Sequence, residues 1–249
     1  MRRALSPLIL TALLAGSNGC STACPTGKLS ELLQQNPKPT AALAALATEA
    51  QADAVKQSDP RNKVSCYRVA AVAAWQSERD DAPVNTITTA GGDACDALPR
   101  HDADAPTDCT AIRVAAPMAT QDAIGRQLQS FAAQLTTPAA KLPGADFAKL
   151  QTAFDGLASQ YDQVSDIRQR ADGLAVPAEV KTRLERYRLI ITCNAISAWT
   201  FSGRCADAPI PAFTAMAQEK QRMITGLGMT TAQVTQACTT SPGSAPPIE

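Results

Sequence analysis

Histidine and aromatic residues are scarce in this 249-residue chain, which has one histidine and only 4% Phe, Trp and Tyr. Because no second histidine is present to complete a zinc site with His101, we expect this residue to be an exposed loop residue rather than a metal ligand. An excess of either charge is also missing, since 23 Lys and Arg residues balance 23 Asp and Glu residues. The composition offers no basic surface for nucleic acid, and we expect no nucleic-acid partner.

The motifs of common enzyme classes are absent from the sequence as well. It has no G-x-S-x-G elbow, no Walker phosphate loop and no dinucleotide fingerprint, and Cys20 and Cys24 are spaced C-x3-C rather than as a redox C-x-x-C pair. The aspartates of one acidic stretch match no calcium-loop spacing; they are Asp93, Asp96, Asp102, Asp104 and Asp108. We expect no catalytic residues, no cofactor and no metal site.

Residues 1–19 have the pattern of a bacterial export signal. Arg2 and Arg3 precede an uncharged, mostly apolar run over 5–15, which is shorter than the about 20 residues that span a bilayer as a helix. Small residues follow directly at Gly16 and Ser17. The pattern predicts export to the cell envelope of a Gram-negative bacterium.

Two processing routes fit this signal. In the first, a lipoprotein signal peptidase cuts after Gly19 and Cys20 becomes the lipid anchor, although Ser17 departs from the branched apolar residue of the usual lipobox. In the second, ordinary cleavage follows Ser17, behind the small residues of an A-x-A-like site. The first route predicts an outer-membrane lipoprotein facing the periplasm, since Ser21 rather than aspartate follows Cys20, and the second a soluble periplasmic protein.

The eight cysteines are expected to form disulfides in an oxidising compartment. Lipidation of Cys20 leaves an odd number of thiols, so this route needs one unpaired cysteine, either buried between helices or at Cys24. For the Cys95–Cys109 pair, closing the loop would contribute about 3 kcal/mol. Near the carboxyl terminus, either Cys193–Cys205 or Cys205–Cys238 is expected. The candidate disulfide cysteines are Cys66, Cys95, Cys109, Cys193, Cys205 and Cys238.

Apolar periodicity and an alanine content of about a fifth predict an all-α protein. The clearest pattern has spacings of 3, 4, 3, 4 and 3 and consists of Phe147, Leu150, Phe154, Leu157, Tyr161 and Val164. A second seam consists of Val180, Leu184, Tyr187, Ile191 and Ala195. Long helices are expected near 110–136, 146–172 and 178–202, with shorter ones at 211–226 and 230–238.

We therefore predict an antiparallel helical bundle of long amphipathic helices, stapled by disulfides and preceded by an N-terminal helical hairpin of helices 41–57 and 62–79. The predicted organisation is a signal peptide over 1–19, a tether over 20–28, the hairpin over 29–80, an irregular acidic loop over 81–110, the long-helix bundle over 111–240 and a disordered tail over 241–249.

Three hypotheses for function follow from this organisation. The leading one is a non-enzymatic envelope scaffold, with a lipid-anchored membrane contact and an unidentified envelope protein as partner. The second is a module that binds a small or lipidic ligand between bundle helices; a closed cavity lined by Leu157, Tyr161, Leu184 and Tyr187 would support it, and a tightly packed seam there would remove it. Trp75, Trp199 and Phe201 could line a cleft, but large aromatic residues in an aromatic-poor chain are more often core anchors. The third is an enzyme that uses His101 with a neighbouring carboxylate.

Overall fold

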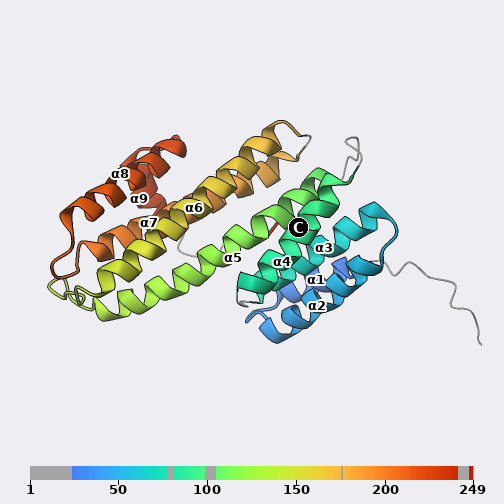
Figure 1. Ribbon diagram of the computed structural model, residues 1–249, viewed down its shortest axis with the longest axis horizontal. Helices are drawn as coiled ribbons and strands as arrows, with labels where there is room; N and C mark the ends of the chain where they lie inside the picture. Colours follow the sequence, from blue (N-terminus) through green and yellow to red (C-terminus); the bar gives the residue numbers. More distant parts are fainter. Residues whose placement is uncertain (1–23, 78–80, 99–104, 175, 241–246, 249) are drawn as a thin grey trace, which may run out of the picture.

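The computed structural model describes residues 24–77, 81–98, 105–174, 176–240 and 247–248. Over these residues the chain is helical, as the sequence predicts (Figure 1). Its helices are α1 (Thr26–Gln34), α2 (Thr40–Lys56), α3 (Pro60–Gln76), α4 (Asp81–Asp96), α5 (Ala105–Gln134), α6 (Asp146–Asp172), α7 (Ala178–Ser202), α8 (Ile210–Gly226) and α9 (Thr231–Thr240).

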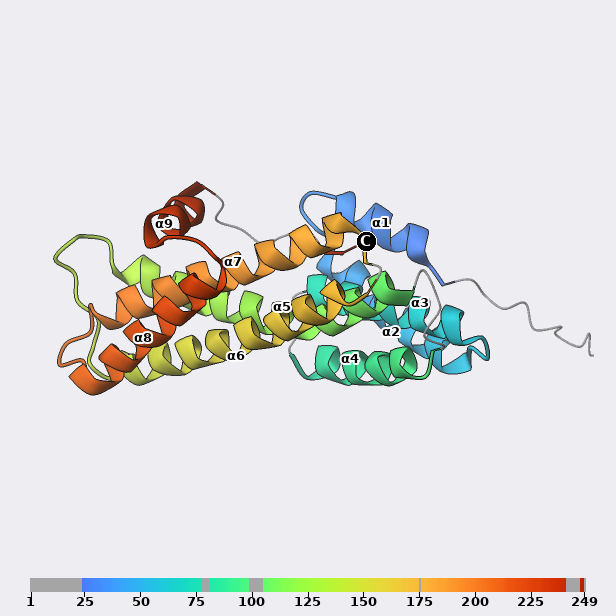
Figure 2. The ribbon, with the colours of Figure 1, turned by 90° about the horizontal axis from the view of Figure 1, so that it is seen from above.

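Helix α5 belongs to both halves of an elongated molecule (Figures 1 and 2). Its amino-terminal part packs on α3 and α4, where a Cβ on Gly91 would lie 2.8 Å from Ile112. Its carboxy-terminal part packs on α6 and α7, where a Cβ on Gly156 would lie 3.0 Å from Ile124. At about 1.5 Å per residue, these 30 residues give an axis of about 45 Å that runs through both bundles.

The two predicted seams are the core of the carboxy-terminal bundle. Every residue of the α6 seam from Phe147 to Val164 is buried, with Leu150 and Leu157 fully so. The α7 seam is equally buried and packs antiparallel to it. Because a fully buried Leu contributes about 1.5–3 kcal/mol, these two faces decide how the helices associate. The bounds of α6 and α7 agree with the predicted ranges 146–172 and 178–202.

The predicted irregular loop over 81–110 is wrong for most of its length, because α4 occupies 81–96 and α5 already begins at Ala105. Val84, Ile87 and Gly91 are buried at helical spacing against α3 and α5. Adjacent glycines such as Gly91 and Gly92 are typical of turns, but here a Cβ on Gly91 would lie 2.8 Å from Ile112 and 3.1 Å from Tyr67. Gly91 is therefore explained by the close packing of α4 against α3 and α5, and not by a turn.

Disulfides staple both bundles, and one of the predicted pairs is confirmed. Cys95–Cys109 joins α4 to α5, with Cα atoms 5.8 Å apart. Both alternatives for the carboxy-terminal end are wrong, because Cys193 pairs with Cys238 at a Cα separation of 5.4 Å. Helix α7 continues for nine residues beyond Cys193, about 13 Å, which carries the following loop away from that thiol. Cys205 is a buried free thiol.

The predicted tether over 20–28 is shorter in the structure. Cys24 forms a disulfide with Cys66 of α3, its Sγ lies 3.1 Å from the Asn62 carbonyl oxygen, and α1 begins at Thr26. This pairing excludes the alternative in which Cys24 is the unpaired cysteine. No helix of the described residues is long and apolar enough to cross a membrane.

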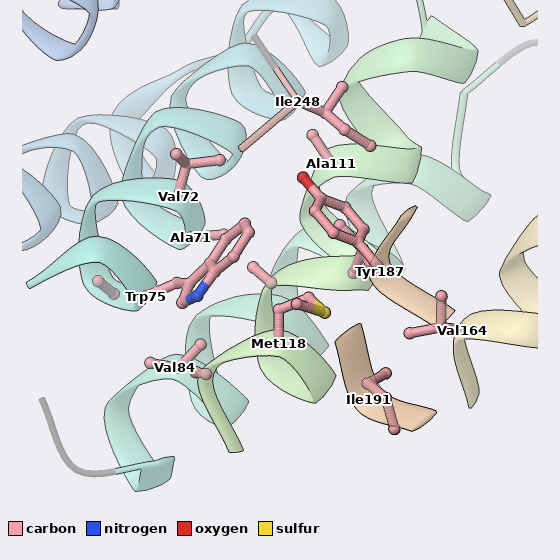
Figure 3. Packing of buried hydrophobic residues seen from close by; sticks show 14 of the residues in the cluster. Ala71, Val72, Trp75, Val84, Ala111, Met118, Val164, Tyr187, Ile191 and Ile248 are labelled. Atoms are coloured by element: carbon pink, nitrogen blue, oxygen red, sulfur yellow. The ribbon is translucent and has the colours of Figure 1, made fainter. Parts of the chain in front are cut away.

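The end of the chain is packed rather than disordered where it is described. Pro247 is buried, and its carbonyl oxygen accepts a hydrogen bond from Arg183 of α7. Ile248 is 1% exposed and belongs to the same packed cluster as Val72, Ala111 and Tyr187 from α3, α5 and α7 (Figure 3). The apolar side chain near the carboxyl terminus thus closes the junction between the two bundles.

Candidate functional site

An open groove of about 600 Å³ lies along the outer side of α6, α7 and α8. Its floor includes Tyr161 of the α6 seam, whose ring is buried while its hydroxyl group reaches the groove. Its walls carry polar side chains from all three helices. The lining residues are Tyr161, Asp162, Ser165, Arg188, Gln218, Gln221, Arg222, Thr225 and Gly226.

Arg188 is the central side chain of this groove, and all of its nitrogen atoms are engaged. Its Nε donates to the Ser165 hydroxyl at 3.0 Å, and its Nη1 donates to Glu185 at 2.7 Å. Its Nη2 donates to the Tyr161 hydroxyl at 2.7 Å and to the Gly226 carbonyl oxygen at 2.6 Å. Arg188 therefore ties the end of α8 to α6 and α7.

Tyr161 completes this network. Its hydroxyl group donates to the Met223 carbonyl oxygen of α8 at 3.0 Å while it accepts from Arg188. The Ser165 hydroxyl donates to the Tyr161 carbonyl oxygen at 2.8 Å, so its proton is directed into the helix rather than toward a base. This geometry makes the groove floor a structural clasp between three helices, without the paired nucleophile and base that acyl transfer needs.

The second cation of the groove, Arg222, is held by two carboxylates. It lies 2.8 Å from Asp162, and its Nε donates to both oxygens of Glu219 at 2.9 Å. These acids raise the pKa of Arg222 further above its ordinary value, mainly through the Glu219 hydrogen bond. The groove therefore presents compensated charge, which suits a polar, uncharged ligand better than a phosphate.

An ion-pair ladder continues from the clasp along α6 and α7. Glu185 accepts from Arg188 on one side and lies 2.9 Å from Arg168 on the other. Arg168 also pairs with Asp172, which in turn lies 3.4 Å from Lys181. The hydrogen bond from Arg168, followed by that from Lys181, lowers the pKa of the Asp172 carboxyl group below its ordinary value.

Trp75 and Trp199 lie in separate ring contacts and do not line one cleft. Trp75 is 3% exposed, meets the Tyr187 ring edge-on with centroids 5.9 Å apart and donates to Asp122 at 2.7 Å. Trp199 stacks on Phe213 of α8 at 5.2 Å, and the Lys220 ammonium group lies 3.2 Å from its ring centroid. Burial lowers the pKa of Lys220. Each tryptophan thus anchors a different helix contact.

The residues expected around a ligand cavity are all buried in the core: Leu157, Tyr161, Leu184 and Tyr187 are each at most 2% exposed. Burial also raises the pKa of Tyr187. Of the acidic stretch, Asp96 pairs with Arg113 at 2.6 Å and Asp108 with Arg68 at 3.0 Å. The described residues hold no cluster of three metal-ligating side chains.

His101, Asp102, Asp104 and Cys20 lie outside the described residues. Cys205 is 5% exposed, its thiol lies 3.7 Å from the Phe201 carbonyl oxygen, and burial raises its pKa. The residues on either side of Cys205 form backbone hydrogen bonds with Leu142. The Leu142 N–H donates to the Arg204 carbonyl oxygen at 3.0 Å, and the Leu142 carbonyl oxygen accepts from the Ala206 N–H at 3.1 Å. This thiol is therefore held inside the fold.

Comparison with known protein families, with curated proteins and with solved structures finds no match to this chain. The groove was not found by sequence reasoning, because its polar residues lie at ordinary positions on three separate helices. The only local signal was Tyr161, a seam residue with a polar end that needs a partner when it is buried.

Proposed function

We propose that this chain is an exported envelope lipoprotein that is anchored through Cys20 and acts as a non-enzymatic scaffold for another envelope protein. The observation that carries the anchor is the pairing of the cysteines. Six of them form three disulfides, and Cys205 is buried without one. No thiol remains that must bridge to Cys20, and the odd count that lipidation leaves is accounted for.

The architecture supports the scaffold part of the proposal. A helix shared by two bundles gives an elongated body with two well-separated ends. Its charged groove residues are bonded to one another, so their chemistry favours a structural role over catalysis. Disulfides in both halves suit a chain that works in an oxidising compartment, on the outer membrane and facing the periplasm.

Intact mass and cysteine counting test the anchor. We expect the purified chain to begin at Cys20 with acyl mass added. Unfolding it without reductant should expose one alkylatable thiol, Cys205, and unfolding it with reductant should expose seven. A chain that begins at Asn18 without acyl mass and gives one thiol more in each case would show ordinary cleavage after Ser17 and overturn the lipoprotein.

Affinity purification tests the scaffold. The tagged full-length chain is crosslinked mildly in its own host, and a Cys20→Ser variant serves as the control. A recurring protein at fixed stoichiometry supports the scaffold. A small molecule or lipid with no protein partner overturns it and favours the second candidate, a binding module that uses the groove at Tyr161 and Arg188.

A further inference from the structure

The Cys24–Cys66 disulfide fixes how far the folded body can lie from a lipid attached at Cys20. Cys20 and Cys24 are four residues apart in the sequence. The chain between them spans at most about 14 Å when it is fully extended. Cys24 is held covalently to α3, and its Sγ lies 3.1 Å from the carbonyl oxygen of Asn62. The turn between α2 and α3 is therefore fixed beside the point where the anchor enters the fold.

We infer that this turn, residues 55–63, is a membrane-contact surface that rests on a phospholipid layer with anionic headgroups. The inference rests on the proposed lipidation of Cys20. The short connection brings the turn to the lipid, and its charge and apolar side chain fit such a surface. The start of α1 and this turn lie at one end of the elongated molecule, and α8 lies at the other (Figures 1 and 2).

The turn carries three cations, Lys56, Arg61 and Lys63, against one carboxylate, Asp59. Asp59 accepts a hydrogen bond from the Asn62 backbone N–H at 2.8 Å and so caps α3. The Lys56 side chain is 74% exposed and lies 3.4 Å from the carboxylate of Asp53, which precedes the turn on α2. Because the potential of an anionic headgroup layer falls off over about 8–10 Å, these cations are attracted to the layer when the turn rests on it and are screened when it does not.

Val55 supplies the apolar contact. It is 69% exposed at the end of α2 and is one of few large apolar side chains exposed in the described part of the chain. Ile210, at the start of α8, is 78% exposed and provides a matched position at the opposite end. An interfacial surface combines apolar residues that enter the headgroup layer with cations around them.

Fluorescence quenching by brominated lipids tests the surface. The acylated full chain, with Val55→Trp or with Ile210→Trp, is placed in vesicles of phosphatidylethanolamine and phosphatidylglycerol with or without brominated acyl chains. The unsubstituted chain gives the background from Trp75 and Trp199, and helical circular dichroism confirms that each variant is folded. We expect a blue shift and loss of emission with bromine for Val55→Trp and no change for Ile210→Trp.

Charge removal tests the headgroup assignment. Arg61→Gln with Lys63→Gln should reduce the quenching of Val55→Trp, whereas Arg126→Gln with Lys141→Gln, at exposed positions in the other half, should not. The same measurement is repeated in vesicles without phosphatidylglycerol. If quenching of Val55→Trp is unchanged both in these neutral vesicles and after charge removal, the assignment to anionic headgroups is overturned. An acylated chain without quenching at position 55, or with equal quenching at 210, overturns the surface while the lipoprotein stands. A chain without acyl mass overturns both.

Discussion

A Cβ atom on Gly226 would lie 2.4 Å from the hydroxyl oxygen of Tyr161. The phenol cannot move away easily, because it is buried and its hydroxyl group is bonded both to Met223 and to Arg188. The absence of a side chain at the end of α8 is therefore what allows this helix to close onto α6. The clasp at the groove depends on it.

Gly226→Ala should consequently destabilise the protein by about 1–3 kcal/mol, the usual cost of overpacking. For a chain of this size the melting temperature would fall by about 2–4 °C for each kcal/mol. Gly92→Ala is the control, since a Cβ at that helical position would have no neighbour within 4 Å apart from the backbone of its own helix. It should raise stability by about 0.5–1 kcal/mol. Equal melting temperatures for both variants would contradict the close contact.

Ile248→Ala should be far more disruptive than its place near the chain end implies. The side chain is 1% exposed, and removal of such a buried group costs about 2–5 kcal/mol. Ile210→Ala, at 78% exposure, should change stability by less than about 0.5 kcal/mol. Urea unfolding of both variants measures the difference, and a harmless Ile248→Ala would mean that the tail does not close the junction in solution.

The disulfides should differ in what they stabilise. Replacing Cys193 and Cys238 by serine opens a connection of 45 residues, which costs about 4 kcal/mol in the chain-entropy treatment. Replacing Cys95 and Cys109 opens one of 14 residues and costs about 3 kcal/mol. Loss of the first pair should release α9 in particular, seen as faster amide exchange there than in α3. Unchanged protection of α9 would show that packing alone holds it.

Asp172 gives a prediction for pH. Its folded-state pKa is lowered below 3.8, chiefly by Arg168, so its ionised form stabilises the fold above that pH. This contribution is lost as the pH falls through the lowered value. Asp172→Asn should therefore reduce the urea midpoint at pH 7, and the difference from the unsubstituted chain should shrink as the pH falls below 3.8 and through the lowered pKa. Because the Asp172 side chain is 57% exposed, 1 M salt should also reduce the difference in urea midpoint between the variant and the unsubstituted chain. A difference that persists at acidic pH would exclude this origin.

Asp155→Asn is the matched control for Asp172→Asn, because the pKa of Asp155 is raised and that of Asp172 is lowered. Burial, and then Glu219, raise the pKa of Asp155, so its ionised form opposes folding. Neutralising it should leave the urea midpoint at pH 7 equal or higher. A loss of stability at both positions would point to lost packing or hydrogen bonding rather than charge.

Local sequence patterns specify the long helices α6 and α7 and the faces that they bury. The seams from Phe147 to Val164 and from Val180 to Ala195 specify which side of each long helix is apolar, and this local periodicity was enough to place the bounds of α6 and α7. The same reasoning missed α4, because Gly91 next to Gly92 carries opposite meanings in a turn and in a tight helix crossing, and only the neighbours Tyr67 and Ile112 decide between them.

Contacts between residues far apart in the sequence depend mostly on how the helices pack in three dimensions. The tertiary structure paired Cys193 with Cys238, buried Cys205, returned Ile248 to the junction and brought Arg188 to Tyr161 and Gly226. Periodicity records which face of a helix is buried, but not which helix covers it or how far two thiols lie apart. Those distances arise from the packing of whole helices against one another, which no local pattern contains.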